Sequence, residues 1–296
     1  MKKLLSLVSL IAVLGILLSS CKEEDKVSGQ QTSAVQDQAT ADAYFSDAGD
    51  MSTSAYNFPS QENLSKGRIS SGGKFTLTFT IINDTRFNGA VLTLEASGTT
   101  VVPQGIITID FGAGQTDPTG TVRKGKILVA YSGYRFTKDA YSITTFDGYS
   151  VNGVKVEGKR TITTTQTFTL SSTFIPFVVK DENGKVTFTD GSFITRSADH
   201  PCKWVLPTTT SKGQWIIEGN ASGVSRDSKS YSFVITTPLL FKVECASTSG
   251  SIPSEGEATL TVDKVPIQLN YGSAGAACDK VIKINVAGIT QDVTVN

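Results

Sequence analysis

The chain has 296 residues, in which 27 lysines and arginines balance 27 aspartates and glutamates, with a single histidine. The formal net charge of +0 argues against a nucleic-acid-binding protein and against a purely electrostatic hold on anionic membranes. The length is sufficient for one large hydrophobic core or two small ones.

The first twenty residues have the parts of a secretory signal. Lys2 and Lys3 precede an apolar run from Leu4 to Leu18, and two serines separate this run from Cys21. This arrangement resembles a bacterial lipoprotein signal, which implies that residues 1–20 are removed and that Cys21 carries lipid. A membrane-spanning anchor is the alternative, but the run is shorter than the roughly 20 apolar residues that a span requires.

A charged cluster follows the lipidation site directly. It consists of Lys22, Glu23, Glu24 and Asp25. The cluster resembles the surface-export signal of lipoproteins from Bacteroidota. We therefore expect a protein that is anchored in the outer membrane by lipid at Cys21 and displayed on the cell surface.

The next segment is polar and has too few apolar residues for a core of its own. We expect residues 21–34 to form a tether and residues 35–60 a helix or linker. Helical spacings of seven, four and three separate Ala34, Ala41, Phe45 and Ala48, which predicts one short helix over residues 33–56 with Asp37 in its first turn. A disordered linker is the alternative, because Gly49 and the serines and threonine at 52–54 oppose a long helix.

From residue 61 to residue 296 the sequence predicts an all-β domain. Apolar and polar residues alternate, as in residues 75–81, 258–262 and 282–286, which is typical of antiparallel strands with one buried face. The absence of long helical periods excludes βαβ units and the nucleotide-binding folds built on them. We expect an antiparallel hairpin meander, curled into an open barrel or a sandwich, with two sub-lobes divided near residue 170.

Four dipeptides predict tight turns between strands. They are Asp147-Gly148, Asn152-Gly153, Asn183-Gly184 and Asp190-Gly191. Such pairs tolerate the positive φ angles that two-residue hairpins require. The Asn152-Gly153 pair gives the clearest of these hairpins.

Two segments of the chain resemble each other. Residues 107–112 (Ile-Thr-Ile-Asp-Phe-Gly) match residues 267–272 (Ile-Gln-Leu-Asn-Tyr-Gly), and each precedes a glycine-rich loop and a strand. An internal repeat and convergent turn chemistry explain this match equally well.

These motifs, together with residues 123–127, 149–153 and 235–239 and with Cys278-Asp279, also resemble a family of surface-exposed Bacteroidota lipoproteins of unassigned activity. The resemblance covers residues 35–296. It implies no catalytic residue, because its motifs are turn and strand chemistry.

Three cysteines remain after Cys21, and an exported chain reaches an oxidising compartment. The place of Cys245 and Cys278 within the segment that resembles the family implies a disulfide between them. Cys202, which we expect in a polar loop, is the competing partner for either one.

Residues for catalysis or metal binding are few. His200 is the only histidine, and we expect it in a surface loop rather than in a zinc site with the cysteines or in a Cys-His nucleophile pair. Paired carboxylates would support glycoside hydrolysis or a calcium site, and the candidates are Asp110, Asp117, Asp181, Glu182 and Asp190. Ordinary turn chemistry explains these acids more simply. We predict no cofactor.

Aromatic side chains are the remaining candidates for recognition: Tyr131, Tyr134, Tyr141, Tyr149, Trp204 and Trp215. We expect most of them in the core and two or three exposed. The sequence therefore favours a non-catalytic binding or structural module of the cell envelope, with an envelope protein or a glycan as its partner. The alternatives are a glycan hydrolase with paired carboxylates and a carrier of an apolar ligand in a half-open barrel.

Overall fold

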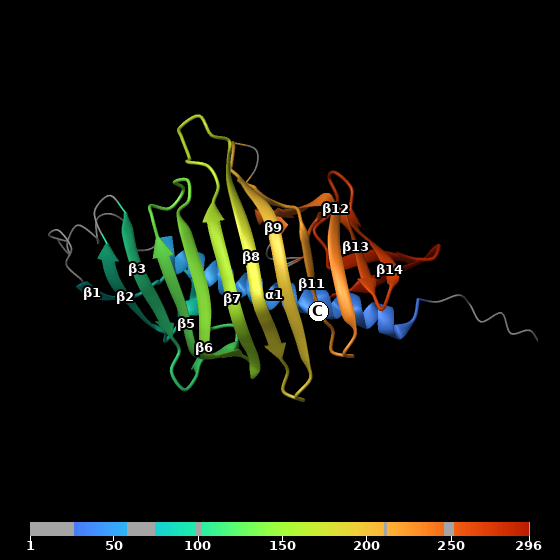
Figure 1. Cartoon of the computed structure of the whole chain (residues 1–296), viewed down its shortest axis with the longest axis horizontal. Helices are drawn as coiled ribbons and strands as arrows, with labels where there is room; N and C mark the ends of the chain where they lie inside the picture. Colours follow the sequence, from blue (N-terminus) through green and yellow to red (C-terminus); the bar gives the residue numbers. More distant parts are fainter. Residues whose placement is uncertain (1–26, 58–74, 99–101, 210–211, 246–251, 296) are drawn as a thin grey trace, which may run out of the picture.

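The structure is a computed structural model that describes residues 27–57, 75–98, 102–209, 212–245 and 252–295. In these residues a single long helix, α1 (Gly29–Asn57), precedes a sheet of sixteen strands (Figure 1). The first eight strands are β1 (Phe75–Phe79), β2 (Val91–Gly98), β3 (Pro103–Asp110), β4 (Gln115–Thr116), β5 (Val122–Ser132), β6 (Tyr141–Val151), β7 (Val154–Thr164) and β8 (Phe174–Thr187). The others are β9 (Phe193–Val205), β10 (Gln214–Ile217), β11 (Asn220–Val224), β12 (Ser230–Lys242), β13 (Glu255–Val262), β14 (Val265–Gly272), β15 (Val281–Val286) and β16 (Ile289–Thr294). Two short 3₁₀ turns, η1 (Thr85–Phe87) and η2 (Val243–Cys245), complete the elements.

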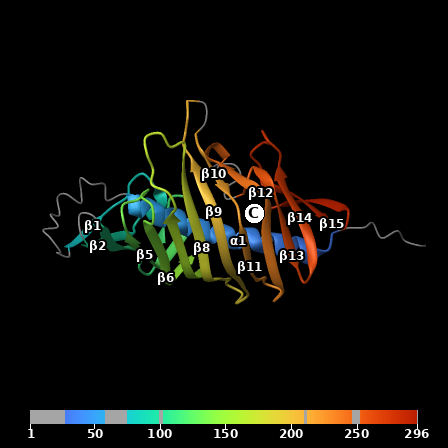
Figure 2. The ribbon, with the colours of Figure 1, turned by 45° about the horizontal axis from the view of Figure 1, so that its top comes forward.

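The sheet is an antiparallel meander in which strands pair in chain order from β1 to β16. Two details depart from a simple zigzag: β10 and β11 both lie between β9 and β12, and β4 pairs with β5 alone. The sheet is single, strongly curved and not closed into a barrel (Figure 2). The predicted all-β meander with one N-terminal helix is therefore confirmed.

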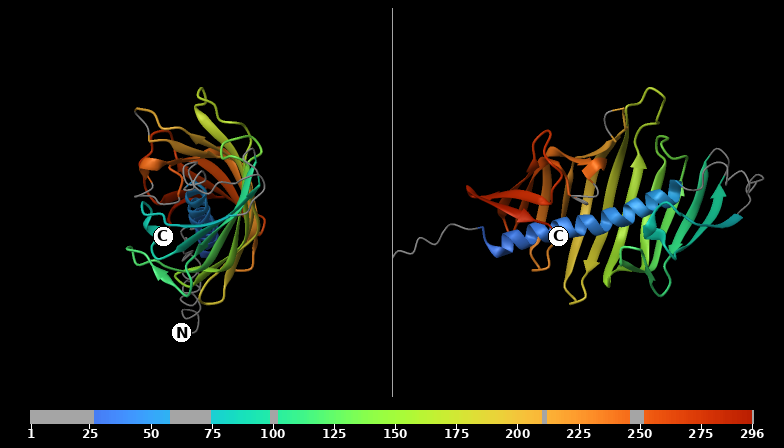
Figure 3. Two further views of the ribbon diagram at one scale, coloured as in Figure 1. Left: turned by 90° about the vertical axis from the view of Figure 1, so that its left-hand side faces the viewer. Right: turned by 180° about the vertical axis from the view of Figure 1, so that it is seen from behind.

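The helix α1 runs along the hollow side of the curved sheet and crosses the strands (Figure 3). Its 29 residues extend about 43 Å at 1.5 Å per residue, which spans about nine strands spaced 4.8 Å apart. Near its start, the side-chain amide of Gln36 donates a hydrogen bond to the carbonyl of Thr294 at 3.5 Å. Near its end, the hydroxyl of Tyr56 donates to the carbonyl of Gly133 at 2.8 Å. One helix thus connects the last strand, β16, to the connection between β5 and β6.

The helix begins earlier than its sequence pattern predicts, because a capping box starts it. The side chain of Gln31 accepts a hydrogen bond from the backbone N–H of Ser28 at 2.9 Å, and the Ser28 hydroxyl accepts one from the N–H of Gln31. The helix is therefore longer than the predicted short helix over 33–56, and its first residues lie within the predicted tether of residues 21–34. Asp37 lies beyond the first turn, contrary to prediction.

Small residues bring α1 close to the sheet. Buried alanines recur every seven residues, at Ala34, Ala41, Ala48 and Ala55, so they stay on one side of the helix. Phe45, fully buried between them, packs over Gly184 of β8, where an added Cβ would lie 2.7 Å from the phenylalanine ring.

Two clusters of buried apolar side chains lie along α1. The first half of the helix, including Val35 and Ala41, packs with strands β9 to β16. The second half, including Phe45 and Met51, packs with strands β2 to β8. Both halves of the sheet therefore depend on the same helix for part of their burial.

Glycines mark a line of bulges across four adjacent strands, β5 to β8. Gly125, Gly148, Gly158 and Gly184 lie at or beside the positions where the pairing register shifts. The first three have φ angles of +78°, +60° and +118°, which favour glycine. Bulges of this kind bend a strand and increase its twist, which accounts for the curvature of the sheet here.

The turn predictions are right at two dipeptides and wrong at the other two. Asn152 and Gly153, with φ of 49° and 81°, form the tight turn between β6 and β7, and Asp190-Gly191 lies in the turn between β8 and β9. The hairpin turns predicted at Asp147-Gly148 and Asn183-Gly184 are wrong, because these dipeptides lie inside β6 and β8, where the register shifts. A bulge and a hairpin both use a positive φ, so the dipeptide does not distinguish them.

The predicted disulfide between Cys245 and Cys278 is confirmed, with Cα atoms 5.1 Å apart and a sequence separation of 33. It joins η2, at the end of β12, to the connection between β14 and β15. Cys202 is a free cysteine, but it lies buried within β9 and not in a polar loop as predicted.

Candidate functional site

The candidate site is a cavity of about 330 Å³ between α1 and the hollow face of the sheet. Residues 42–56 of α1 line one side, and side chains from β6 to β10 and from β12 line the other. The volume lies at the lower end of the range for small-molecule sites. We call this space the trough cavity.

Polar side chains line the helix side of the trough cavity. They recur three or four positions apart and therefore share one face of α1: Asp42, Ser46, Asp50, Thr53 and Tyr56. The buried alanines lie on a neighbouring face. The helix thus turns its small residues to the sheet and its polar residues to the cavity.

Apolar side chains from the sheet line the opposite side. They share the inward-facing positions of their strands: Ile162, Phe177, Val179, Trp215, Ile217, Phe233, Ile235, Leu239 and Phe241. We call this set the apolar wall. Several of its members, such as Val179, Ile217 and Ile235, are only half-buried. The wall is therefore partly open to solvent inside the fold.

Aromatic rings stiffen one part of the apolar wall. Trp204 and Trp215 face each other across β9 and β10 with ring centroids 4.9 Å apart, and Phe177 lies 6.0 Å from Trp215. Of the other aromatic candidates, Tyr131 and Tyr149 are buried in the core, whereas Tyr134 and Tyr141 are 37% and 39% exposed. Trp215 and Tyr141 are the two predicted aromatic residues that reach the trough cavity.

A chain of ion pairs lies beside the cavity and joins the helix to three strands. Both oxygens of Asp181 accept hydrogen bonds from Arg160, at 2.7 and 2.9 Å, and one also accepts from Arg196 at 3.0 Å. Arg196 also pairs with Asp42 of α1 at 2.5 Å, and Arg160 donates to the carbonyl of Phe45 at 2.8 Å. These contacts fix the register of the helix on the sheet.

Burial makes this chain of ion pairs electrostatically strong. The Asp181 side chain is fully buried, which by itself would raise its pKa, but Arg160 and Arg196 outweigh that effect and lower the pKa of Asp181 to about 2. Burial would lower the pKa of Arg196, yet Asp42 and Asp181 raise it above its usual value. Asp181 and Arg196 therefore stay charged at neutral pH.

The histidine belongs to the same chain of contacts. Burial and the neighbouring Arg196 lower the pKa of His200, so its ring is neutral at neutral pH. Its Nδ1 lies 2.9 Å from the carbonyl of Glu218, and its Nε2 lies 3.2 Å from Arg196, so Nδ1 donates and Nε2 accepts. The predicted surface loop is wrong: His200 is buried within β9. The thiol of Cys202, two residues on, has its pKa raised to about 12 by burial and is inert as a nucleophile at neutral pH.

Two charged side chains of the trough cavity differ from those of the ion-pair chain. Neither Asp50 nor Arg135 has a side-chain hydrogen bond or ion pair with any residue that the structure describes. Arg135 lies in the connection between β5 and β6, with its guanidinium 4.2 Å from the centre of the Phe136 ring, and desolvation lowers its pKa to about 10. Asp50 is accessible within the cavity, yet the protein around it raises its pKa by desolvation. These two groups are available to a bound molecule.

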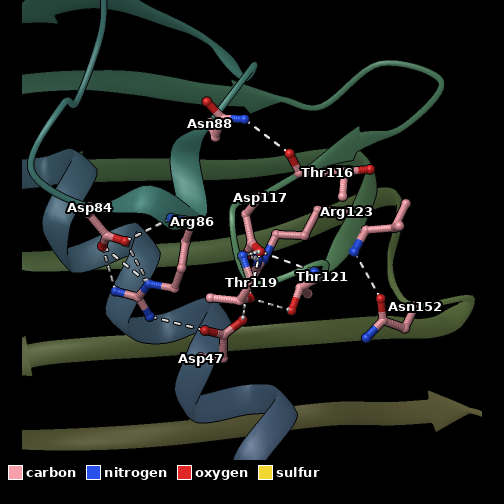
Figure 4. A network of polar contacts seen from close by, with 11 residues as sticks. Asp47, Asp84, Arg86, Asn88, Thr116, Asp117, Thr119, Thr121, Arg123 and Asn152 are labelled. Atoms are coloured by element: carbon pink, nitrogen blue, oxygen red, sulfur yellow. Dashed lines mark hydrogen bonds and ion pairs between the residues drawn. The ribbon is translucent and has the colours of Figure 1, made fainter. Parts of the chain in front are cut away.

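A second polar cluster fixes the far part of the helix. Asp47 of α1 lies between Arg86 and Arg123, at 3.0 and 3.1 Å, and Arg123 also pairs with Asp117 at 2.8 Å (Figure 4). The carboxylate of Asp117 accepts further bonds from the N–H groups of its own turn, and its pKa falls to about 2 although burial opposes the shift. Because its charged groups pair with one another, this cluster is structural.

The acids considered for hydrolysis or calcium binding have local partners. Asp110 accepts a bond from the N–H of Gly112, Glu182 pairs with Lys159, and Asp190 pairs with Arg226. None of these three acids, nor Asp117 or Asp181, is among the residues that line the trough cavity. Across the described residues there is also no group of three or more histidine, cysteine or acidic side chains arranged to hold a metal ion.

The sequence analysis missed Arg135, Arg160, Arg196 and the acids of α1. One signal was present: the helix carries aspartates at 37, 42, 47 and 50 and no basic residue. Four acids on a helix that needs burial predict basic partners on the surface that covers it. Arginines pair with Asp42 and Asp47, and the backbone N–H of Arg226 donates to Asp37 at 2.9 Å, whereas Asp50 has no such partner among the described residues.

Comparison with protein families, with curated proteins and with solved structures finds no match to this chain. In the described segments no helix is both long enough and apolar enough to cross a membrane. Cys21 and the charged cluster of Lys22, Glu23, Glu24 and Asp25 lie outside the described residues.

Proposed function

We propose that this protein is a non-catalytic binding module of the cell envelope and that the trough cavity is its ligand site. We also propose that lipid at Cys21 anchors it in the outer membrane and that residues 22–25 direct it to the cell surface. The second part is supported by the lipoprotein-like leader and by the resemblance to surface-exposed Bacteroidota lipoproteins. The membrane is then a partner through the lipid alone.

The half-buried apolar wall carries the binding proposal. Burial of apolar surface yields about 25 cal/mol per Å², so a folded chain gains by covering such side chains. Here the wall is left beside a cavity, although α1 covers the neighbouring part of the same face. A small molecule with an apolar portion would bury Ile217, Ile235 and Phe241 further on binding.

A neutral fluorescent probe tests this binding directly. N-phenyl-1-naphthylamine should bind the folded protein with a rise in fluorescence, because the apolar wall shields it from water. Ile235→Trp, which places a large ring in the cavity, should weaken binding about tenfold. Val234→Trp is the matched control, since Val234 directly precedes Ile235 in β12 and is 47% exposed. Equal binding by both variants and by the unmodified protein would place the probe elsewhere and refute the site.

Membrane fractionation tests the anchor. Cys21→Ala should release the protein from outer membranes that are washed with salt. Replacement of Glu23, Glu24 and Asp25 by alanine should leave the protein in the membrane but protect it from external protease in intact cells. If the Cys21 variant still sediments in full with the membranes, the lipid anchor is wrong.

A carrier of an apolar ligand is the second candidate, and the same wall favours it. A carrier must release its ligand to an acceptor, whereas a binding module retains it. Transfer of the bound probe to added phospholipid vesicles, faster than its spontaneous loss into buffer, would favour the carrier.

A further inference from the structure

We propose that the ligand of the trough cavity is an elongated amphiphile with one anionic head group, which Arg135 binds, and an apolar body that lies along the apolar wall. This inference rests on the proposed function, because it names the class of ligand for the same site. Three observations carry it: the unpaired state of Arg135, the compensation of the other cations, and the direction in which the wall extends.

Arg135 differs from the other arginines of the inner face. Arg86, Arg123, Arg160 and Arg196 each pair with at least one carboxylate at 3.1 Å or less. Arg135 has no such partner in the described part of the chain, although it lines the cavity and is partly buried. A cation that is desolvated without an acceptor lowers stability, so an anion from outside the chain would relieve this cost.

Phe136 holds the guanidinium of Arg135 in position for such a contact. The ring lies 4.2 Å from the guanidinium carbon, which fits stacking of the two planar groups. Stacking leaves the N–H groups at the edge of the guanidinium free, and this fork matches a carboxylate or phosphate. Phe136 is in turn held by Phe168, with ring centroids 6.4 Å apart.

The remaining charges around the cavity are already compensated. Asp181 and Asp42 neutralise Arg160 and Arg196, and Lys242 pairs with Glu255 at 2.5 Å. Asp50 lies in the field of Arg160 and Arg86, and desolvation raises its pKa, so the protein around it disfavours its negative charge. Arg135 is therefore the cation that selects the charge of the ligand.

The apolar wall extends away from Arg135. Tyr56, the last cavity residue of α1, lies at the Arg135 end, and Asp42 marks the other end. These two positions are fourteen residues apart, or about 21 Å along a helix. On the sheet side, the wall runs from Ile162 in β7 to Phe241 in β12, across five strand positions and hence about 19 Å. The helix segment and the wall overlap only in part, because Asp42 pairs with Arg196 of β9 whereas the wall continues to β12. Together they form an elongated lining, which fits an extended apolar chain better than a compact ring system.

Competition between probes of equal chain length tests the head group. Laurate, dodecanol and dodecyltrimethylammonium should each be titrated against bound N-phenyl-1-naphthylamine, below the concentrations at which they form micelles. Laurate should displace the probe at a concentration about tenfold lower than dodecanol, because only laurate forms charge-assisted hydrogen bonds with Arg135. The cationic amphiphile should be the weakest of the three.

Substitutions at residue 135 assign the effect. Arg135→Gln should reduce laurate affinity about tenfold and leave dodecanol unchanged, while Arg135→Lys should retain part of the preference. Lys138→Gln is the matched control, since this exposed lysine lies in the same connection and outside the cavity. If laurate and dodecanol compete equally, or if Arg135→Gln changes neither, the anionic head group is wrong while the cavity stands. If none of the amphiphiles displaces the probe, the proposed binding site fails as well.

Discussion

The hollow face of the sheet has two parts, which differ in whether their charged side chains form ion pairs. Where α1 covers the sheet, each buried carboxylate finds an arginine: Asp181 binds Arg160 and Arg196, and Asp47 binds Arg86 and Arg123. Where the trough cavity separates the helix from the sheet, Asp50 and Arg135 have no such partner among the described residues. The apolar wall there stays half-buried.

This difference separates structure from binding. Buried polar groups are normally satisfied, because each unpaired one destabilises the fold. In the covered part the charged groups are paired and hold the helix in place, although single buried atoms such as Arg123 Nε have no hydrogen-bond partner among the described residues. In the open part Asp50 and Arg135 lack a charged partner at a concave surface, where a ligand can supply one. The predictions below test this division, from the largest effect to the smallest.

The largest effect should come from Asp181. Asp181→Ala leaves Arg160 and Arg196 buried without the carboxylate that they share, so we expect a loss of about 3–5 kcal/mol in the free energy of unfolding. Asp199→Ala is the matched control on the outer face, where the exposed pair with Lys180 should contribute about 1 kcal/mol or less. Urea denaturation measures both. Similar losses would mean that the covered part has no special role.

Acid titration gives a second measurement on the same residue. The pKa of Asp181 is about 2 in the folded protein, below its ordinary value of 3.8. A lowered pKa stabilises the fold above pH 4, and this contribution disappears as the pH falls from about 4 to about 2. Asp181→Asn should therefore reduce the loss of stability in that interval. If Asp181→Asn loses as much stability in that interval as the unmodified protein, other carboxylates cause the loss.

The disulfide lies outside both parts of the hollow face, so its removal gives a reference value for the loss of stability. Cys278→Ser opens a loop of 33 residues, for which chain entropy predicts a loss of about 3–4 kcal/mol. Cys202→Ser, at the free cysteine, should change stability far less, because the new hydroxyl can donate to the carbonyl of His200 as the thiol does. Peptide mapping without reductant should recover the 245–278 linkage, and a linkage to residue 202 would contradict the assignment.

The close approach of the helix to the sheet is tested at Gly184. An added Cβ would lie 2.7 Å from the Phe45 ring and 2.8 Å from the carbonyl oxygen of Arg196. Gly184→Ala should therefore cost about 1–3 kcal/mol through overpacking. Gly29→Ala, at the start of α1 with no atom within 4 Å of the new Cβ, is the control and should be neutral or slightly stabilising. A neutral result at residue 184 would show that the helix can shift outward.

Local signals in the sequence are sufficient to predict the strands and one hairpin turn, but not the bulges that bend the strands. Alternating residues predict the antiparallel strands, and Asn152-Gly153 predicts its hairpin turn. Asn183-Gly184 has the same local chemistry and yet forms a bulge within β8. The difference arises because β8 continues to pair with β7 and β9 beyond the bulge, and these pairings join residues that are distant along the chain.

The candidate site was beyond the reach of the sequence for the same reason. Arg160 binds Phe45 across 115 positions, and no periodic pattern reports a contact of that kind. The sequence predicts a loop at His200 and Cys202, but Pro201 between them lies in β9 opposite the break between β10 and β11, where the regular pairing is interrupted. Because polar residues occupy inward-facing positions of β9, its sequence does not show the alternation of apolar and polar residues that predicts a strand.

The smallest effect, and the sharpest test of the division, compares two aspartates of the same helix. Asp42 is paired with Arg196, whereas Asp50 has no ion pair with the described residues. Asp42→Asn should cost about 1–3 kcal/mol, because it weakens a charge-assisted hydrogen bond to a buried arginine. At Asp50 we expect the opposite sign for the change in the free energy of unfolding. Desolvation raises the pKa of Asp50, so its ionised carboxylate destabilises the fold as the pH rises above 3.8, the ordinary pKa of this group. Asp50→Asn should therefore leave stability at pH 7 unchanged or increase it by less than about 0.5 kcal/mol. Thermal melting of the two variants at pH 7 decides this, and equal destabilisation by both would show that Asp50 supports the fold.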